Sequence, residues 1–219
     1  MIKIAHISDV HIRKNISRHE EYRIVFNKTY KELEEQKPDI IVIVGDLYHD
    51  YIDLEGEAEI LMGEFLNRLS KIAKVIITRG NHDMRKKNKN RKDVIETITT
   101  LIDNPNVIYY NKSGFYSDGI ITWVVHHHLE GINPWYDIKH KRDNTKIYID
   151  LYHDPIQGCK GHNGYPLKNS KYKLSDLKGD YSMLGDIHLR QFFKTRSIEM
   201  EIDKKDLGKY IKNGWYIEK

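Results

Sequence analysis

Five short clusters of metal-capable side chains lie along the chain, and each follows a run of apolar residues. In chain order their members are Asp9 and His11, Asp46 and His49, Asn81 and His82, His153, and Asp186 and His188. In an extended segment, residues i and i+2 point to the same side, so Asp9 and His11 can reach one ion. Asp186 and His188 have the same spacing. Carboxylate, imidazole and amide oxygen together suit Mn, Fe or Zn better than Mg, which prefers oxygen ligands.

These donors predict chemistry on phosphate. One Asp on a central strand can bridge two ions, and ions roughly 3.5–4 Å apart can clamp a phosphate and activate water for in-line attack. Glycines directly precede Asp46, Asn81 and Asp186 and allow sharp exits from the strands. Each cluster alone also has a purely structural interpretation, because Gly-Asp is a common turn and Gly-Asn-His-Asp fits a type I′ turn. Five clusters at five predicted strand ends favour a metal site.

The elements that position the first clusters alternate between strand and helix. Short β-branched runs predict buried strands at Ile2–Ile7, Ile40–Val44 and Lys74–Thr78. Amphipathic spacing predicts helices at Glu20–Gln36 and Glu55–Ser70. The alternation predicts parallel strands with right-handed crossovers, and ligands bind at the carboxyl edge of such a sheet.

The second half of the chain has shorter strand candidates separated by Gly, Asn and Asp. After a predicted helix at Val94–Ile102, the candidates are Val107–Tyr110, Ile120–Val125, Lys146–Leu151, Tyr181–Leu184 and Ile198–Ile202. Their pattern predicts a more antiparallel, meander-like region. We therefore expect an α/β fold in which a second sheet packs on the first, a two-sheet αββα sandwich with helices outside.

Composition is typical of a folded intracellular chain. The chain has 219 residues, of which 39% are hydrophobic and 31% charged, and this suits one domain with at most a small appendage. The net charge of +4 favours a polyanionic partner only weakly. A single cysteine, Cys159, excludes an intrachain disulfide and a thiolate zinc site. Because we find neither a signal-peptide pattern nor an apolar stretch of ~20 residues, we expect a cytoplasmic location without membrane contact.

Taken together and in order, the motifs resemble those of the calcineurin-like metallophosphoesterases. The shared elements, over roughly residues 1–193, are Asp-x-His (9–11), Gly-Asp (45–46), Gly-Asn-His-Asp (80–83), His153 and Gly-x-x-His (185–188). Within that class the likeness is to the nuclease subunit of SbcCD-type exonucleases, a group with eukaryotic meiotic-recombination and phage members. The segments that carry it are Gly-Asp-Leu-Tyr-His (45–49), Leu-Tyr-His-Asp-Pro-Ile (151–156) and Leu-Gly-Asp-Ile-His-Leu-Arg-Gln (184–191).

The resemblance implies a role for each cluster. One divalent ion would be held by Asp9, His11, Asp46 and His188, and a second by Asp46, Asn81, His153 and Asp186. His82 would contact the scissile phosphate and protonate or stabilise the leaving oxygen, with assistance from His49. Many relatives have Gly-His-x-His where this chain has Asp186, and the added negative charge favours Mn.

The resemblance also implies a Mn-dependent DNA exo- and endonuclease of double-strand-break repair or recombination. Its partners would be DNA, an SMC-like ATPase and a second copy of the chain, and a viral protein acting in a host cell fits the phage-like motifs. We expect a nuclease domain at 1–193 and a short remnant at 194–219 that helps complete the second sheet. The family's cap domain would be absent or much reduced, which puts ATPase docking in doubt.

Two other functions stay open, namely a metallophosphoesterase with a small phosphodiester or phosphoprotein substrate, and an inactive metal-binding scaffold. The basic tract after Gly-Asn-His-Asp could grip DNA or could be a solvated loop; its members are Arg85, Lys86, Lys87, Lys89, Arg91 and Lys92. For the remaining candidates we expect structural roles outside the metal site; these are the His126–His128 run, His162, Trp123, Trp135, Tyr136 and Cys159.

Overall fold

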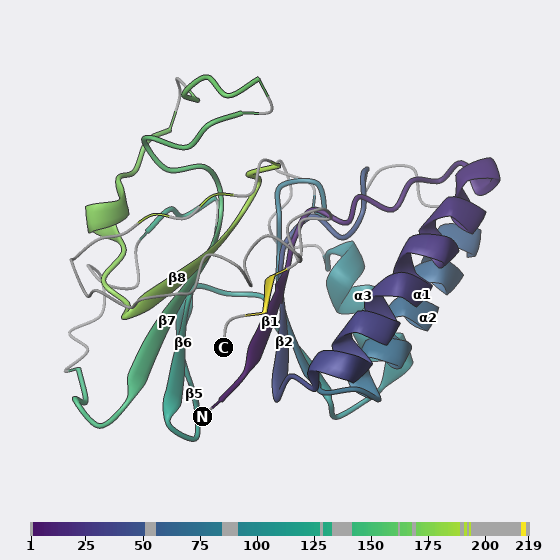
Figure 1. Cartoon of the computed structure of the whole chain (residues 1–219), viewed down its shortest axis with the longest axis horizontal. Helices are drawn as coiled ribbons and strands as arrows, with labels where there is room; N and C mark the ends of the chain where they lie inside the picture. The colour runs from purple at the N-terminus through teal and green to yellow at the C-terminus, as the bar shows by residue number, and fades with distance from the viewer. Residues whose placement is uncertain are drawn as a thin grey trace.

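Two β-sheets packed face to face form the molecule (Figure 1). The computed structural model describes residues 2–50, 56–84, 92–127, 129–132, 142–161, 163–167, 170–188, 191, 193 and 216–217. Several predictions concern residues outside these ranges, namely those for residues 85–91, His128, Trp135, Tyr136, His162 and Ile198–Ile202. None of the helices in the described ranges has the length and apolar character needed to span a bilayer.

The first sheet has the strand order β4-β3-β2-β1-β9. Its members are β1 (Ile4–Ile7), β2 (Ile40–Val44), β3 (Lys74–Thr78), β4 (Val107–Tyr110) and β9 (Tyr216–Ile217). Strands β1 to β4 are parallel, which confirms the predicted alternation, and β9 pairs antiparallel with β1. β4 therefore belongs to the first sheet, and its assignment to the meander-like region was wrong.

Three helices cover one face of this sheet (Figure 1). They are α1 (His19–Gln36), α2 (Gly56–Ser70) and α3 (Val94–Ile102). The rings of Phe26 and Phe65 stack 4.1 Å apart between α1 and α2. α1 ends where Lys37 takes a left-handed conformation, and α3 begins at Asp93, whose carboxylate accepts a hydrogen bond from Glu96 N. Short 3₁₀ turns lie at Ile16–Arg18 and Leu174–Asp176.

The second sheet is largely parallel, which corrects the antiparallel prediction. Its order is β5 (Gly114–Asp118), β6 (Ile121–His126), β7 (Ile147–His153) and β8 (Tyr181–Gly185). Among these described strands only β5 and β6 pair antiparallel, because a two-residue turn joins them. Segments 127–146 and 154–180 each return the chain to the starting edge, so β6, β7 and β8 run parallel. β5 was not predicted, because its mixed, half-buried residues lack an apolar run.

Side chains of β2 alternate between two cores. Ile41 and Ile43 pack under the helices, whereas Val42 and Val44 pack against Trp123 of the second sheet. The two-sheet sandwich is thus confirmed, as is the structural role of Trp123. Among the described residues, the outer face of the second sheet is covered by a smaller cluster that includes Cys159, and none of these residues forms a cap domain. The predicted contribution of 194–219 to the second sheet stays a prediction outside residues 216–217.

Candidate metal centre

The carboxyl ends of the central strands meet at one edge, where the chain turns sharply. Four site residues have left-handed backbone conformations, with φ of 56° at Asp9, 51° at His11, 52° at Asp46 and 59° at Asp186. Such conformations are uncommon outside glycine and concentrate at functional sites. Backbone hydrogen bonds between the loops hold them, from Asp9 N to Gly45 O (3.2 Å) and from His11 N to Asp46 O (2.9 Å). The turns direct these side chains to a common edge.

The three glycines before the clusters serve different purposes. Gly45 has φ of 74°, so it provides the predicted sharp exit. Gly80 and Gly185 do not have positive φ, and they are needed because other groups approach them closely. A Cβ at Gly80 would lie under 3.0 Å from the backbone nitrogen of Asp46, and one at Gly185 would meet the ring of His153. The prediction of sharp exits was therefore right for one glycine of the three.

A buried group joins the two sheets through Asp46 and His153. Ligand atoms of Asp9, Asp46, His153 and Asp186 all lie within 4.8 Å of one another. His153 Nε2 lies 3.1 Å from Asp46 Oδ2 and 3.2 Å from Asn81 Oδ1. Its other ring nitrogen, Nδ1, donates to Val44 O at 2.7 Å, which orients Nε2 toward the carboxylate and the amide oxygen. These atoms converge as ligands around a cation do.

Electrostatics in this group favour a negative Asp46 beside a positive His153. Burial opposes charge on His153, but its contact with the Asp46 carboxylate prevails and raises the pKa of His153 to about 9. Burial likewise opposes charge on Asp46, and His153 nevertheless lowers the pKa of Asp46. Burial raises the pKa of Asp186. The proton on His153 stands where a cation could bind instead, since metal binding displaces protons from its ligands.

A second group contains Asp9, His11 and His188, whose ligand atoms also lie within 4.8 Å of one another. His11 Nε2 is 3.6 Å from Asp46 Oδ2, so this oxygen faces both His11 and His153. Burial lowers the pKa of His11 to about 4, although Asp46 and Asp9 raise it. Both ring nitrogens of His11, and Asp46 Oδ2, are buried without a hydrogen-bond partner. Buried polar atoms are almost always partnered, so these orphaned atoms fit an ion between them.

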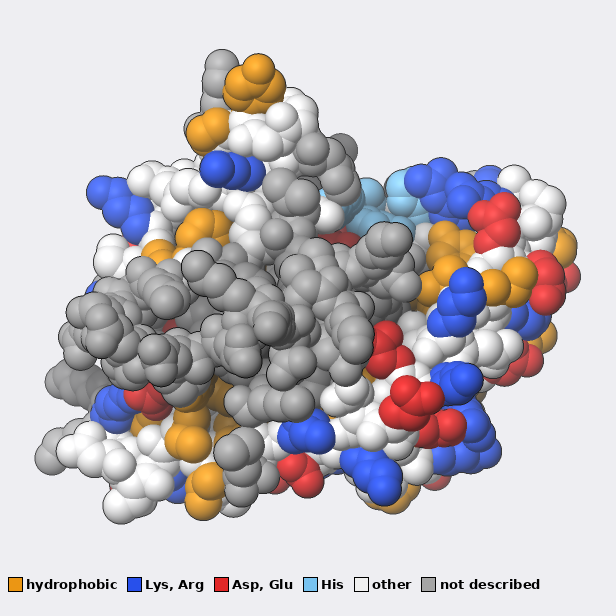
Figure 2. All heavy atoms as spheres, viewed as in Figure 1, with side chains coloured by type: hydrophobic (Ala, Val, Ile, Leu, Met, Phe, Trp, Pro, Cys, Tyr) orange, Lys and Arg blue, Asp and Glu red, His pale blue; other side chains and the backbone are white. Residues whose placement is uncertain are grey.

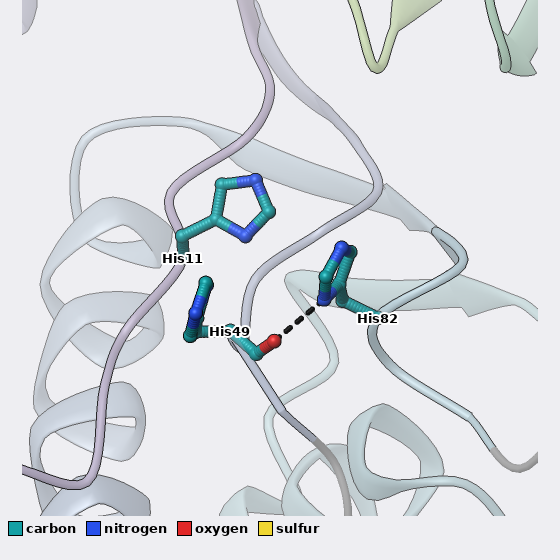
Figure 3. Close-up of side chains that lie close together, drawn as sticks. All are labelled: His11, His49 and His82. Atoms are coloured by element: carbon teal, nitrogen blue, oxygen red, sulfur yellow. Dashed lines mark hydrogen bonds between the residues drawn. The ribbon is translucent and has the colours of Figure 1, made fainter.

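A third group is formed by the imidazoles of His11, His49 and His82 (Figure 3). The ring centroids of His11 and His82 are 5.0 Å apart, and those of His11 and His49 are 5.5 Å apart. His82 Nδ1 donates to His49 O at 2.6 Å, and His82 N donates to Asp46 Oδ1 at 2.9 Å. The backbone of His49 therefore orients the ring of His82. The structure brings together all nine predicted side chains.

Asp83 is a site residue that the sequence reasoning did not assign. Its buried carboxylate accepts hydrogen bonds from the backbone N–H groups of Asp46 (2.8 Å), Gly80 (2.9 Å) and Tyr48 (3.0 Å). Burial, reinforced by the charge of Asp46, raises the pKa of Asp83 to about 7. The carboxylate thereby fixes the exits of β2 and β3 to each other. The signal was present as the last residue of Gly-Asn-His-Asp, because tight corners leave N–H groups for a carboxylate to accept.

The weaker sequence candidates lie apart from these groups. His126 Nε2 is 2.7 Å from Asp150 in a fully buried pair, and none of the metal-capable groups in the described part of the chain contains it. Lys92, the described member of the basic tract, lies 3.7 Å from Glu96 at the start of α3. Cys159 is buried, and burial raises the pKa of its thiol. These observations agree with structural roles for His126 and Cys159.

A two-sheet α/β sandwich with carboxylates, imidazoles and an amide at one sheet edge defines the class of the metal-dependent phosphoesterases. Within that class, the family described as calcineurin-like phosphoesterase matches residues 2–200. The chain therefore belongs to the calcineurin-like phosphoesterase family. Members of this family use a dimetal centre, and the groups above supply candidate ligands for it.

Individual relatives are nucleases or proteins without an assigned role. The chain is 38% identical over 204 residues to uncharacterized protein R555 of Acanthamoeba polyphaga mimivirus, covering 86% of this chain and 15% of that protein. It is 26% identical over 215 residues to the SbcD component of the nuclease SbcCD of Staphylococcus epidermidis, covering 85% and 57%. It is 30% identical over 105 residues to DNA double-strand break repair protein Mre11 of Methanopyrus kandleri, covering 46% and 22%. The chain thus spans 15% to 57% of the length of these relatives.

Solved structures that resemble the chain are also nucleases or phosphoesterases. Pseudomonas putida nuclease MPE is 14% identical with a TM-score of 0.40, and the match covers 75% of this chain and 66% of that one. The phosphoesterase YfcE of E. coli is 17% identical with a TM-score of 0.36, and the match covers 75% and 76%.

Proposed function

We propose that the chain is a Mn-dependent DNA nuclease that hydrolyses phosphodiester bonds at a two-ion centre. One observation carries the two-ion part of this proposal. Asp46 Oδ2 is buried without a hydrogen-bond partner and faces His11 at 3.6 Å and His153 at 3.1 Å, as a bridging ligand would. Asp9, His11, Asp46 and His188 would hold one ion, and Asp46, Asn81, His153 and Asp186 the other. The bound ions would polarise the phosphate and supply a nucleophile from water at neutral pH.

The chain's own groups would orient the substrate and move a proton. With Nδ1 of His82 held by His49 O, the opposite ring nitrogen points away from His49 (Figure 3). In its protonated form, His82 can donate that second N–H to the leaving oxygen while it keeps its hydrogen bond to the backbone. His49, whose ring stacks 5.6 Å from that of His82, would position the phosphate.

The choice of DNA as substrate rests on the relatives. Two of them are named as part of a nuclease and as a DNA double-strand break repair protein. By analogy we propose a role in double-strand-break repair or recombination, with an SMC-like ATPase as partner and a homodimer as the working form. The mimivirus relative supports the further proposal of a viral protein that acts inside a host cell. Manganese is proposed because Asp186 adds a hard carboxylate ligand.

The first experiment compares wild type with His82→Ser on linear duplex DNA and single-stranded DNA, with Mn as the added metal. We expect cleavage by wild type, loss of cleavage in the variant, and two bound ions per chain in both proteins. Equal trials with Mg, Zn and Fe identify the preferred metal. Retained metal content shows that the variant has lost a catalytic group and not its fold.

The same experiment separates the alternative functions. Hydrolysis of bis(4-nitrophenyl) phosphate with intact DNA, and without inhibition by DNA, would support a small phosphodiester or a phosphoprotein as substrate. Two bound ions without turnover on any phosphodiester would support an inactive scaffold. Either result would overturn the nuclease proposal.

A further inference from the structure

Arg13 lies at the edge of the candidate site, beside His49. The chain after β1 pairs with the chain after β2 through a bridge between Ile12 and Tyr48, and His49 N donates to Ile12 O at 3.0 Å. Ile12 and Tyr48 are both buried in the core under the helices. Because successive side chains of an extended segment point to opposite sides, Arg13 and His49 are directed away from that core. The face to which they point is that of the three imidazoles.

Two side chains from the first turn of α1 fix this part of the chain. The buried His19 donates from Nε2 to Arg13 O at 2.7 Å. Tyr22 donates from its hydroxyl to His11 O at 2.5 Å. The backbone of Arg13 is therefore anchored on both sides, while its side chain is exposed. A cation on an anchored backbone loses less conformational freedom on binding an anion than one on a loose loop.

The charge of Arg13 is available to a ligand. Within the described part of the chain, no carboxylate forms an ion pair with Arg13. The neighbouring Arg18, by contrast, pairs with Glu21 at 2.7 Å. Burial, with a contribution from the charge of Arg13, lowers the pKa of His49, which agrees with a guanidinium close to that imidazole. Figure 2 shows Lys and Arg side chains next to the histidines at the rim of a hollow.

We propose that Arg13 binds the phosphate next to the scissile one on a nucleic-acid strand, and so makes the site selective for a polynucleotide over an isolated phosphodiester. This inference rests on the proposed nuclease function and names a residue that would set its specificity. A guanidinium can form a bidentate pair with phosphate, which a small phosphodiester with one phosphate group could not use at this distance from the ions. Arg13 would contact substrate but take no part in bond cleavage.

The test measures KM and kcat of Arg13→Ala on a single-stranded oligonucleotide and on bis(4-nitrophenyl) phosphate, both with Mn. We expect KM for the oligonucleotide to rise about tenfold, with kcat and the small-substrate kinetics within about twofold of wild type, because one binding contact is lost. The slope of log KM against log salt should become shallower by about 0.7, the value for one single-strand phosphate contact. Arg13→Lys should restore part of the affinity, because it keeps the charge and loses the bidentate geometry.

Arg18→Ala is the matched control. It removes the same charge from the same segment, but that charge is already paired with Glu21, so its kinetics should stay at wild-type values. If wild type cleaves the oligonucleotide and Arg13→Ala has an unchanged KM and salt slope, the inference is wrong and the nuclease proposal stands. An equal loss in both variants, or an equal loss on both substrates, would also overturn it. If wild type hydrolyses only the small substrate, the proposed function fails and the inference fails with it.

Discussion

At the scale of single residues, the site depends on two buried carboxylates with different surroundings. Asp46 sits between two imidazoles, and Asp83 sits behind it and holds three backbone N–H groups. The first faces the imidazoles as a ligand would, whereas the second shapes the loop on which that ligand is carried. Separating the two roles experimentally requires variants that keep side-chain size.

Asp83→Asn should weaken both the fold and the metal site. The amide keeps one acceptor oxygen but turns an NH₂ group toward backbone donors, and a buried unsatisfied group of this kind costs about 1–3 kcal/mol. Loss of such support around a ligand typically lowers metal affinity about 10- to 100-fold. Urea unfolding and Mn titration calorimetry measure the two effects. Asp118→Asn, which disrupts a partly exposed pair with Lys74, is the control and should change stability by at most about 1 kcal/mol.

The His153–Asp46 pair should make the metal-free protein less stable at alkaline pH. The pKa of His153 is raised from 6.5 to about 9, so the folded state binds this proton more tightly than the unfolded state. The resulting stabilisation is complete below pH 6.5 and is lost as pH rises through about 9, with a total on the order of 2–3 kcal/mol. Unfolding measured against pH in a chelator tests this. Asp46→Asn, which removes the cause of the raised pKa, should flatten the profile, and an unchanged profile would contradict the pairing.

At the scale of elements, the site is made by short loops that leave parallel strands and cross within van der Waals contact. The packing predicts opposite effects for two glycines. Gly80→Ala would place a Cβ under 3.0 Å from Asp46 N, so we expect destabilisation by about 1–3 kcal/mol and loss of metal binding. Gly63 lies inside α2, and an added Cβ there would have Ile98 as its nearest neighbour at 3.8 Å. Gly63→Ala should therefore stabilise the protein by about 0.5–1 kcal/mol. Thermal unfolding of both variants checks the sign of each effect.

The elements of the first sheet and the ligands at their ends were predictable, because apolar runs and the residues that follow them are local signals. The direction of β7 and β8 was not, because it depends on where segments 127–146 and 154–180 return the chain. β4 was placed in the wrong half for the same reason, since its pairing with β3 follows from the packing of α3 and not from its own four residues. Asp83 escaped notice because its partners are backbone groups, which have no sequence signature of their own.

At the scale of the whole molecule, the candidate ligands come from both sheets. Asp9, His11, Asp46 and Asn81 follow strands of the first sheet, whereas His153, Asp186 and His188 belong to or follow strands of the second. An ion held by both sets would connect the sheets at the edge beyond their shared apolar core. Metal binding should therefore stabilise the sandwich as a unit and not only the loops that carry the ligands.

This coupling predicts a large effect of Mn on unfolding. A ligand that binds only the folded state adds about 2.7 kcal/mol per site at a concentration 100 times its dissociation constant, so the chelated protein should unfold at a clearly lower temperature than the Mn-loaded one. Hydrogen exchange should slow on addition of Mn in β7 and β8 as well as in β1 and β2, because the ions bridge the two sheets. In Asp46→Asn the shared ligand is lost, and Mn should then protect neither sheet strongly. Protection confined to the first sheet would show that His153 and Asp186 do not share an ion with Asp46, and would contradict a centre built across the sandwich.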